Sequence, residues 1–285
     1  MGFIGAGRVG VSLGKYFKEK GRRVAGYYSL SPESAGWAAE FTETTYYGNL
    51  QEIMSSCDMI FFTMPDGAIA SVWEQAKQFA GGKIICHCSG LHSSKIFSDI
   101  GRLGSFAYSI HPLMAISSRE SSWKELSDAL FTIEGDEKYL SFLEQMFRSM
   151  GNRTKIISAE NKIKYHAAAA ISSNYMTALF DMSQTLLLEC GFGEKEAREE
   201  LFRLANGNLV HILEDGCEGA LTGPIERNDL QTVRGHLSML EGDMEKAYRA
   251  NAGYLISVAQ RKHPDRDYSE VKTLCAENKE SEKSE

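Results

Sequence analysis

The sequence lacks a long apolar run, a surplus of basic residues and a signal-peptide pattern. No apolar stretch approaches the roughly 20 residues that a membrane-spanning helix needs, so we expect no membrane association. The net charge is −7 and no basic cluster is present, which argues against nucleic-acid binding. Glycines interrupt the apolar residues at the N-terminus before Arg8, unlike the apolar core of a signal peptide.

Cysteine is also sparse for a disulfide framework, with six residues scattered over 285. This usage predicts reduced thiols in a cytoplasmic protein. Cys86-His87-Cys88, followed by His92, raises the possibility of a metal site. Strand alternation puts the two thiols on one face and His87 on the other, and no second ligand pair completes a tetrahedral set. We therefore expect no bound metal.

What is present is a composition typical of globular domains, with 43% hydrophobic and 24% charged residues. In the first half, short apolar runs alternate with helical patterns, which predicts an α/β domain with a doubly wound, mainly parallel sheet. Strands are predicted at 2–4, 23–28, 44–47, 58–64, 83–87, 105–110, 129–133 and 154–157. Helices are predicted at 9–20, 32–41, 50–55, 68–78, 94–100 and 137–150.

After residue 158 the pattern changes to long helices, at 162–189, 194–214 and 229–261, the last with a break. We therefore expect two domains, 1–158 around the sheet and 159–275 entirely α-helical. Residues 276–285 contain no large apolar side chain and predict a disordered tail.

Three glycines near the N-terminus, Gly5, Gly7 and Gly10, are spaced G-x-G-x-x-G between an apolar strand and a helix. In that setting the first permits a tight turn, the second lets the backbone approach a pyrophosphate, and the third allows close helix–sheet packing. The helix N-terminus adds free N–H groups and partial positive charge. An incidental glycine turn is the alternative. We expect a dinucleotide to contact the loop residues Gly5, Ala6, Gly7, Arg8, Val9 and Gly10.

The end of the second strand indicates which dinucleotide binds. NAD sites usually carry an acid there for the ribose hydroxyls, but this chain has Ser29-Leu30-Ser31 and no acid before Glu33. The serine hydroxyls suit the 2′-phosphate of NADP because they donate hydrogen bonds without repulsion, and Arg8 adds positive charge. Helix capping is an alternative role for both serines. The pattern favours NADP over NAD.

Three later strands end at the edge of the sheet where ligands bind in such folds. Met64 and Pro65 follow the fourth strand, although a plain turn would also use them. Ser89 follows the fifth strand, where we expect it to meet the nicotinamide end of the cofactor. His111 ends the sixth strand and could bind an anionic substrate or assist proton transfer. A histidine tied to a loop carbonyl is its alternative.

The first long helix carries a second group of candidates. Lys162 and His166 are four residues apart and therefore project together. Asn174 lies eight residues further on and can border the same cleft. A solvated lysine and a packing histidine are the alternative interpretations.

At this point the chain resembles the two-domain Rossmann-like oxidoreductases whose C-terminal part is domain of unknown function 2520. These are relatives of the 6-phosphogluconate, β-hydroxyacid, ketopantoate and pyrroline-5-carboxylate reductase group. The matching segments are GAGRVG at 5–10, YYSLS at 27–31, MPDGAI at 64–69, HCSG at 87–90, IHPL at 110–113, IEGDE at 133–137, KIKYHAAAAISSNYMTAL at 162–179 and TGPIERND at 222–229.

The resemblance implies a Rossmann NADP-binding domain, a 6-phosphogluconate-dehydrogenase-like helical domain, and an active site between them. Lys162 falls on the lysine that handles the proton in the better-known relatives, with His166 where they have an amide. Leu30 stands where closer relatives often have Arg, and Asn228 where they often have Gly. By analogy Thr222, Arg227 and His236 line the substrate pocket or a homodimer contact.

Two functions are therefore compatible with the sequence. The first is an NADP-dependent oxidoreductase acting on a small keto, imino or hydroxy compound. In it, Lys162 or His166 moves the proton while Ser89 and His111 orient the substrate. The second is an NADP-binding sensor or scaffold without turnover.

Overall fold

The computed structural model describes residues 1–276. Its contacts form two compact units that divide between Tyr175 and Met176. The division lies inside the long helix α6 (Lys162–Glu189), later than the expected boundary near residue 158. The first turn of α6 belongs to the first unit because Lys162 is hydrogen-bonded to residues of its sheet region.

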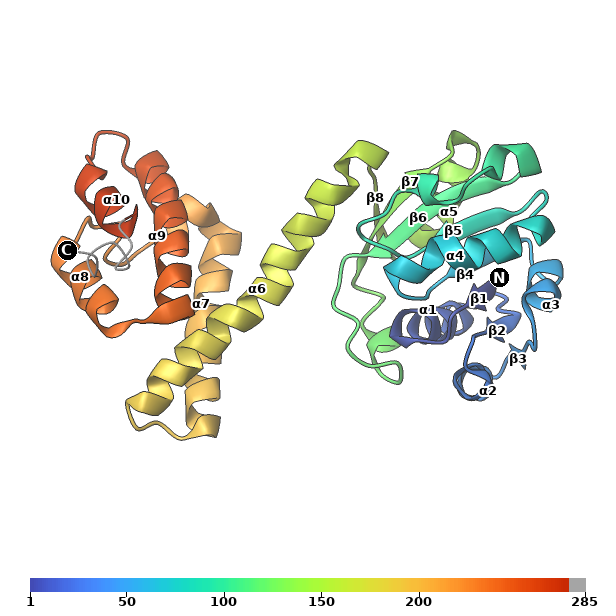
Figure 1. Ribbon diagram of the computed structural model, residues 1–285, viewed down its shortest axis with the longest axis horizontal. Coiled ribbons are helices and arrows are strands. Elements are labelled where there is room, and N and C mark those ends of the chain that lie inside the picture. Colours follow the sequence, from blue (N-terminus) through green and yellow to red (C-terminus); the bar gives the residue numbers. More distant parts are fainter. Residues whose placement is uncertain (277–285) are drawn as a thin grey trace. The chain divides into compact units, whose positions relative to one another are not determined.

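The first unit is built on a sheet of eight strands in the order β3-β2-β1-β4-β5-β6-β7-β8 (Figure 1). All neighbouring strands are parallel except β6 and β7, so the predicted mainly parallel, doubly wound sheet is confirmed. The strands are β1 (Gly2–Ile4), β2 (Gly26–Tyr28), β3 (Thr45–Tyr46), β4 (Met59–Phe62), β5 (Ile84–His87), β6 (Phe106–Pro112), β7 (Leu130–Gly135) and β8 (Arg153–Ile156).

Strand alternation divides the apolar side chains between two cores, one on each face of the sheet. Phe3 and Phe61 pack on one face, and their neighbours Ile4 and Phe62 pack on the other. The first core also contains side chains of α1 (Arg8–Glu19), α2 (Pro32–Thr42) and α5 (Glu137–Ser149). The second contains side chains of α3 (Leu50–Ser55) and α4 (Asp66–Ala76).

One predicted helix of this unit, at 94–100, is wrong. The segment forms two short 3-10 turns, Ser94–Ile96 and Ile100–Leu103, separated by Asp99 in the left-handed region at φ 57°. The backbone N–H and hydroxyl of Ser94 both donate to the Glu134 carboxylate. The local pattern is helical, but this distant partner holds the chain in a turn.

The second unit is entirely helical in its described residues. Its helices after α6 are α7 (Glu194–Ala220), α8 (Leu230–Met239), α9 (Gly242–Lys262) and α10 (Ser269–Ala276). The predicted break in 229–261 is found at Leu240-Glu241, between α8 and α9. Helix α7 continues past the predicted end through a kink at Gly216 (φ 73°), and α10 was not expected.

The predicted disordered tail lies outside the described residues except for Ala276, which ends α10. Within residues 1–276, none of the helices combines the length and the apolar character that crossing a bilayer requires.

Candidate functional site

The glycine-rich loop connects β1 to α1, as the strand–turn–helix interpretation requires. Gly5 has φ +111°, and a Cβ there would lie 2.8 Å from the Thr63 carbonyl carbon. A Cβ on Gly10 would meet the Thr63 hydroxyl and come within 2.5 Å of the Gly5 carbonyl oxygen. Gly7 has open space around it. Two glycines therefore allow the loop and β4 to approach closely, and the third leaves room for a ligand.

The N-terminus of α1 fits an anionic group. No side chain caps it and no acid lies in its first turn, so its first N–H groups remain available. A cavity of 460 Å³ lies beside the loop. Six of the predicted cofactor contacts line it, namely Gly7, Arg8, Val9, Met64, Pro65 and Ser89. Ala6 is instead buried in the core, and Gly5 and Gly10 face Thr63, the residue that follows β4.

The end of β2 carries both of the roles considered for its serines. Ser31 caps α2 by accepting from the Ser34 N–H at 3.1 Å, and the Ser29 hydroxyl accepts weakly from the Ser31 N–H at 3.4 Å. Accepting leaves each hydroxyl proton free to donate to a ligand. Leu30 between them is 81% exposed.

Lys162 is the central charged group of the site, and it is only 1% exposed. Its Nζ donates to the Ser109 hydroxyl at 2.6 Å and to the Ser89 carbonyl oxygen at 2.8 Å. Burial lowers the pKa of Lys162 to about 8, against the opposing effect of nearby Glu134. The alternative of a solvated first-turn lysine is therefore excluded. Two acceptors leave the third N–H of the ammonium group for a ligand.

Ser89 lies between the cavity beside the glycine loop and Lys162. Its hydroxyl donates to Asp66 Oδ2 at 2.8 Å and accepts from the backbone N–H groups of Leu91 and His92. The donor needed to orient a substrate is therefore already used, and the carbonyl oxygen is the part of Ser89 that serves Lys162.

His111, Tyr165 and His166 form a second polar group around Gly90. The Tyr165 hydroxyl lies 2.7 Å from His111 Nδ1. A Cβ on Gly90 would lie 2.7 Å from His166 Nδ1 and 3.0 Å from His111 Nε2, so a glycine is needed there. Burial, with smaller effects of Lys162 and His166, lowers the pKa of His111 to about 3. His111 is therefore neutral near pH 7 and cannot hold an anion by charge. His166 Nδ1 is buried without a hydrogen-bond partner.

His87 has a structural role under this site. Its Nδ1 accepts from the Ser89 N–H and its Nε2 donates to the Ser93 carbonyl oxygen. Burial lowers its pKa to about 3. No cluster of three or more His, Cys, Asp or Glu side chains suited to a metal is found in residues 1–276.

The lowered pKa of His87 predicts a loss of stability in acid. The unfolded chain takes up this proton near pH 6.5 and the folded chain only near pH 3, so stability falls as the pH drops below 6.5. At pH 5 the contribution of His87 to the loss is about 2 kcal/mol. Urea unfolding at pH 7.5 and 5 should therefore show a smaller loss for His87→Gln than for the wild type. The exposed His211→Gln is the control, and equal losses in all three proteins would contradict the prediction.

The remaining predicted residues are not brought to Lys162 by the contacts of the first unit. Asn174 is exposed on α6. In the second unit, Thr222 lines an apolar cavity, Arg227 is exposed, and His236 Nδ1 is hydrogen-bonded to the Tyr248 hydroxyl at 2.9 Å. Asn228 has φ 60°, the left-handed conformation that glycine readily adopts.

Sequence reasoning missed three residues that shape the site: Asp66, Glu134 and Tyr165. Tyr165 is three positions after Lys162 and so shares its helix face. Glu134 is an acid in an otherwise apolar strand, which is a signal for a buried partner.

The comparisons with known proteins agree with the fold. Residues 1–112 match the Rossmann-like domain and residues 129–255 match the domain of unknown function DUF2520. Among curated proteins no match is found.

Three solved structures are similar over most of their length. Protein TM1727 from Thermotoga maritima is 27% identical with a TM-score of 0.70, over 92% of this chain and 98% of that one. BF3122 from Bacteroides fragilis, provisionally described as an NADP oxidoreductase, is 21% identical with a TM-score of 0.70, covering 92% and 97%. The NADP-bound pyrroline carboxylate reductase of Plasmodium falciparum is 13% identical with a TM-score of 0.59, covering 96% and 97%. The chain therefore contains, in this order, a segment that matches the Rossmann-like domain and a segment that matches the DUF2520 domain.

Proposed function

We propose that the chain is an NADP-dependent oxidoreductase that transfers hydride between the nicotinamide and a small keto, imino or hydroxy compound. The observation that carries the proposal is the buried ammonium group of Lys162. It is bound to the carbonyl oxygen of Ser89, a residue that also lines the cavity beside the glycine loop. A proton donor thus lies next to the expected cofactor position.

Several features support NADP as the cofactor. The uncapped α1 N-terminus suits the pyrophosphate, and the free hydroxyl protons of Ser29 and Ser31 with Arg8 suit the 2′-phosphate. No carboxylate takes the place that NAD sites reserve for one. Two of the similar structures are described as NADP proteins.

When bound, the cofactor supplies or accepts the hydride. The residues of the chain handle the proton. Lys162, with its pKa near 8, is mostly protonated at neutral pH and can donate its third N–H to a carbonyl or imine group. The neutral His111, hydrogen-bonded to Tyr165, offers a polar group without adding charge.

The test measures binding and turnover separately. NADPH is titrated into the protein by calorimetry, and its oxidation is followed by absorbance with a panel of keto acids, ketones and cyclic imines. Reversed assays use NADP and hydroxy acids. Turnover with any class supports the proposal, whereas tight NADPH binding without turnover across the panel would favour the sensor or scaffold function.

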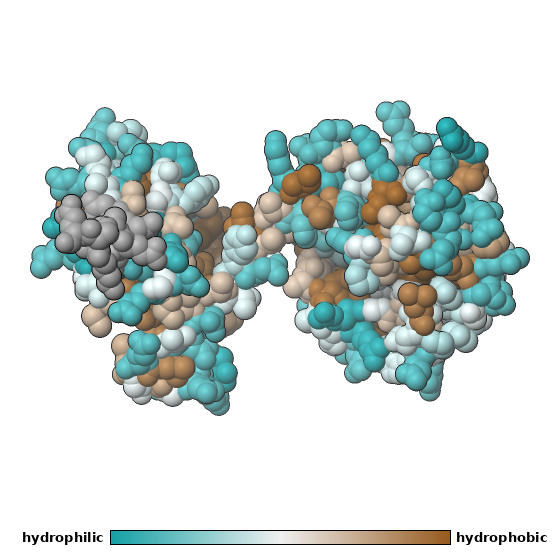
Figure 2. Space-filling model, viewed as in Figure 1, coloured by the Kyte–Doolittle hydropathy of each residue, from teal (hydrophilic) through white to brown (hydrophobic). Residues whose placement is uncertain are grey.

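A homodimer formed through the second unit is part of the proposal. The main apolar cluster of that unit comes from α8, α9, α10 and adjoining loops, and among the described residues α7 buries only two small side chains, Ala197 and Ala220. Hydrophobic side chains remain on the surface of those two helices (Figure 2), with Leu204 73% and Leu213 85% exposed. An apolar helix face of this extent needs a partner.

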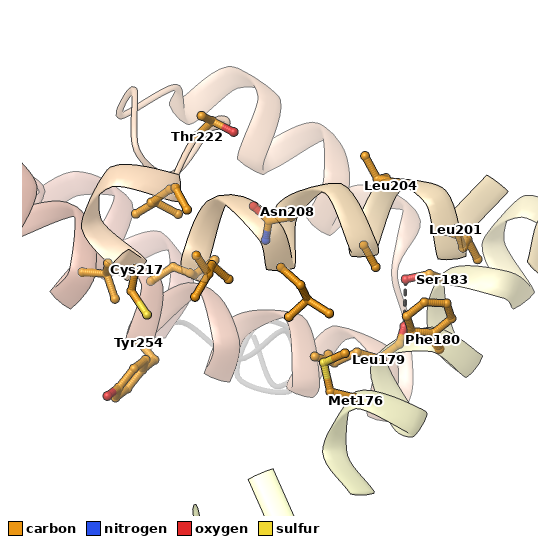
Figure 3. Close-up of a pocket in the computed structure, with 17 residues that line it drawn as sticks. Met176, Leu179, Phe180, Ser183, Leu201, Leu204, Asn208, Cys217, Thr222 and Tyr254 are labelled. Atoms are coloured by element: carbon orange, nitrogen blue, oxygen red, sulfur yellow. Dashed lines mark hydrogen bonds between the residues drawn. The ribbon is translucent and has the colours of Figure 1, made fainter. Parts of the chain in front are cut away.

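An apolar cavity of 690 Å³ lies on the same face, between α6, α7 and α9. Figure 3 shows Met176, Leu179 and Leu201 around it, with Asn208 and Thr222 as polar members. A second copy suits this surface because a two-fold contact pairs an apolar patch with itself.

Adding a charge to this face should separate the subunits. Leu204→Glu replaces an exposed side chain, so the free energy of unfolding of a monomer should change by no more than about 0.5 kcal/mol. A dimer should dissociate, because the charge would be buried in its interface. Light scattering after gel filtration should give two 31.7 kDa chains for the wild type and one for the variant. Gln231→Glu, which adds the same charge at an exposed site of α8, should remain dimeric. A monomeric wild type would refute the prediction.

A further inference from the structure

The site contains a buried carboxylate that the proposed chemistry does not use. Glu134 on β7 is 5% exposed, and both of its oxygens accept hydrogen bonds, from the Ser94 N–H at 2.7 Å and the Ser94 hydroxyl at 2.8 Å. Burying a charge without a compensating charge or hydrogen bonds is costly, so its position needs an explanation.

The pairing of strands brings Glu134 to Lys162. Ser109 on β6 is directly opposite Glu134 on β7, and residues opposite each other in an antiparallel pair point to the same face. The Ser109 hydroxyl accepts a hydrogen bond from Lys162 Nζ at 2.6 Å. The two buried charges are therefore neighbours on one face of the sheet with Ser109 between them.

The other groups that face Lys162 are weaker partners. Asp66 at the start of α4 is only half-buried and accepts from the Ser89 hydroxyl. The Cys88 thiol after β5, whose pKa burial raises to about 12, is neutral, as are His87 and His111, and burial raises the pKa of Tyr165.

We propose that Glu134 is a positioning residue whose buried carboxylate is the counter-charge that keeps Lys162 in its ammonium form beside Ser89 and Ser109. Its two hydrogen bonds to Ser94 hold the carboxylate in place. The role of this ammonium group in catalysis rests on the proposed function, but the charge coupling itself does not.

The variant Glu134→Gln tests the coupling. Glutamine has the same shape and can keep both contacts to Ser94, by accepting from its N–H and donating to its hydroxyl, while the charge is lost. The pKa of Lys162 should then fall by about one unit, because an opposite charge nearby favours the ammonium form. Glu137→Gln, which removes an exposed acid three residues later, should leave the pKa of Lys162 unchanged.

The measurement is NMR of the protein with 13C-labelled lysine, in which the Lys162 Cε signal is assigned from its loss in Lys162→Met. The measurement needs neither substrate nor cofactor. It can therefore refute the charge coupling while the proposed enzyme function stands, and it can support the coupling even if no turnover is found. An unchanged pKa in Glu134→Gln would overturn the inference.

A double variant keeps the test decisive if Glu134→Gln does not fold. When the cause is an uncompensated ammonium group, Lys162→Met in the same chain should restore folding. When the cause is loss of the Ser94 contacts alone, the double variant also fails to fold, and the role as counter-charge is refuted. Once a substrate is found, the pH profile of kcat should shift in Glu134→Gln by the same amount as the pKa.

Discussion

Lys162→Met should lower kcat for NADPH oxidation by about 10³-fold, the range expected for loss of a general acid, while NADPH binding changes by less than about threefold. Methionine occupies a similar volume, so the pocket beside Ser109 stays filled. The variant also removes a buried charge, so the protein gains stability because the desolvation cost of that charge disappears. Some of that gain is lost because Glu134 is then left without its counter-charge.

The pH dependence separates this role from a packing role. Carbonyl or imine reduction needs the protonated lysine, so the wild-type kcat should fall as the pH rises through about 8. The residual activity of Lys162→Met should lack that step. Lys164→Met, at an exposed position of the same helix, is the matched control and should behave as the wild type. Activity of Lys162→Met within threefold of the wild type would exclude a catalytic role for Lys162.

Alanine substitutions in the glycine loop should separate cofactor binding from stability. Gly7 has φ −82° and ψ −171°, which alanine adopts without strain, and its Cβ would meet no protein atom. Gly7→Ala should therefore keep or raise stability by up to about 1 kcal/mol. Because Gly7 lines the cavity, the added methyl group should weaken NADPH binding by about tenfold or more, or about 1.4 kcal/mol.

Gly10→Ala should show the opposite balance. Its Cβ would collide with the Thr63 side chain and with the Gly5 carbonyl oxygen, so α1 must move away from β4. We expect a loss of about 1–3 kcal/mol in the free energy of unfolding, as in other overpacked cores. Urea unfolding and NADPH calorimetry on both variants check the pair. Equal effects of the two alanines on binding would contradict the assignment of separate roles to these glycines.

Most of the strands were predictable from sequence because they are short apolar runs that end at a turn, whereas β3 and β8 are largely exposed. The antiparallel direction of β7 was not predicted, since no local pattern distinguishes it. The helix predicted at 94–100 was wrong because Ser94 bonds to Glu134, 40 positions away. Helix α10 was not predicted for a similar reason, because its buried residues Val271 and Cys275 pack against α8 and α9, which lie outside its own short segment.

The residues of the site were predictable in part. Lys162 and Ser89 were both identified, but their contact joins residues 73 positions apart and depends on the order of the strands. Periodicity indicates which face of a helix or strand a side chain occupies, but it does not indicate which other element packs against that face. The hydrogen bond from the Ser89 hydroxyl to Asp66 therefore could not be predicted from the sequence.

The position of Lys162 has a consequence for how such proteins can be recombined. The lysine lies within the segment that matches DUF2520, whereas its acceptors Ser89 and Ser109 lie within the Rossmann-like match. A chimera that joins these two modules from different homologues would inherit the lysine from one parent and its acceptors from the other. If the proposed function holds, we expect an active hybrid only from parents that agree on this contact, because the buried ammonium group needs both acceptors.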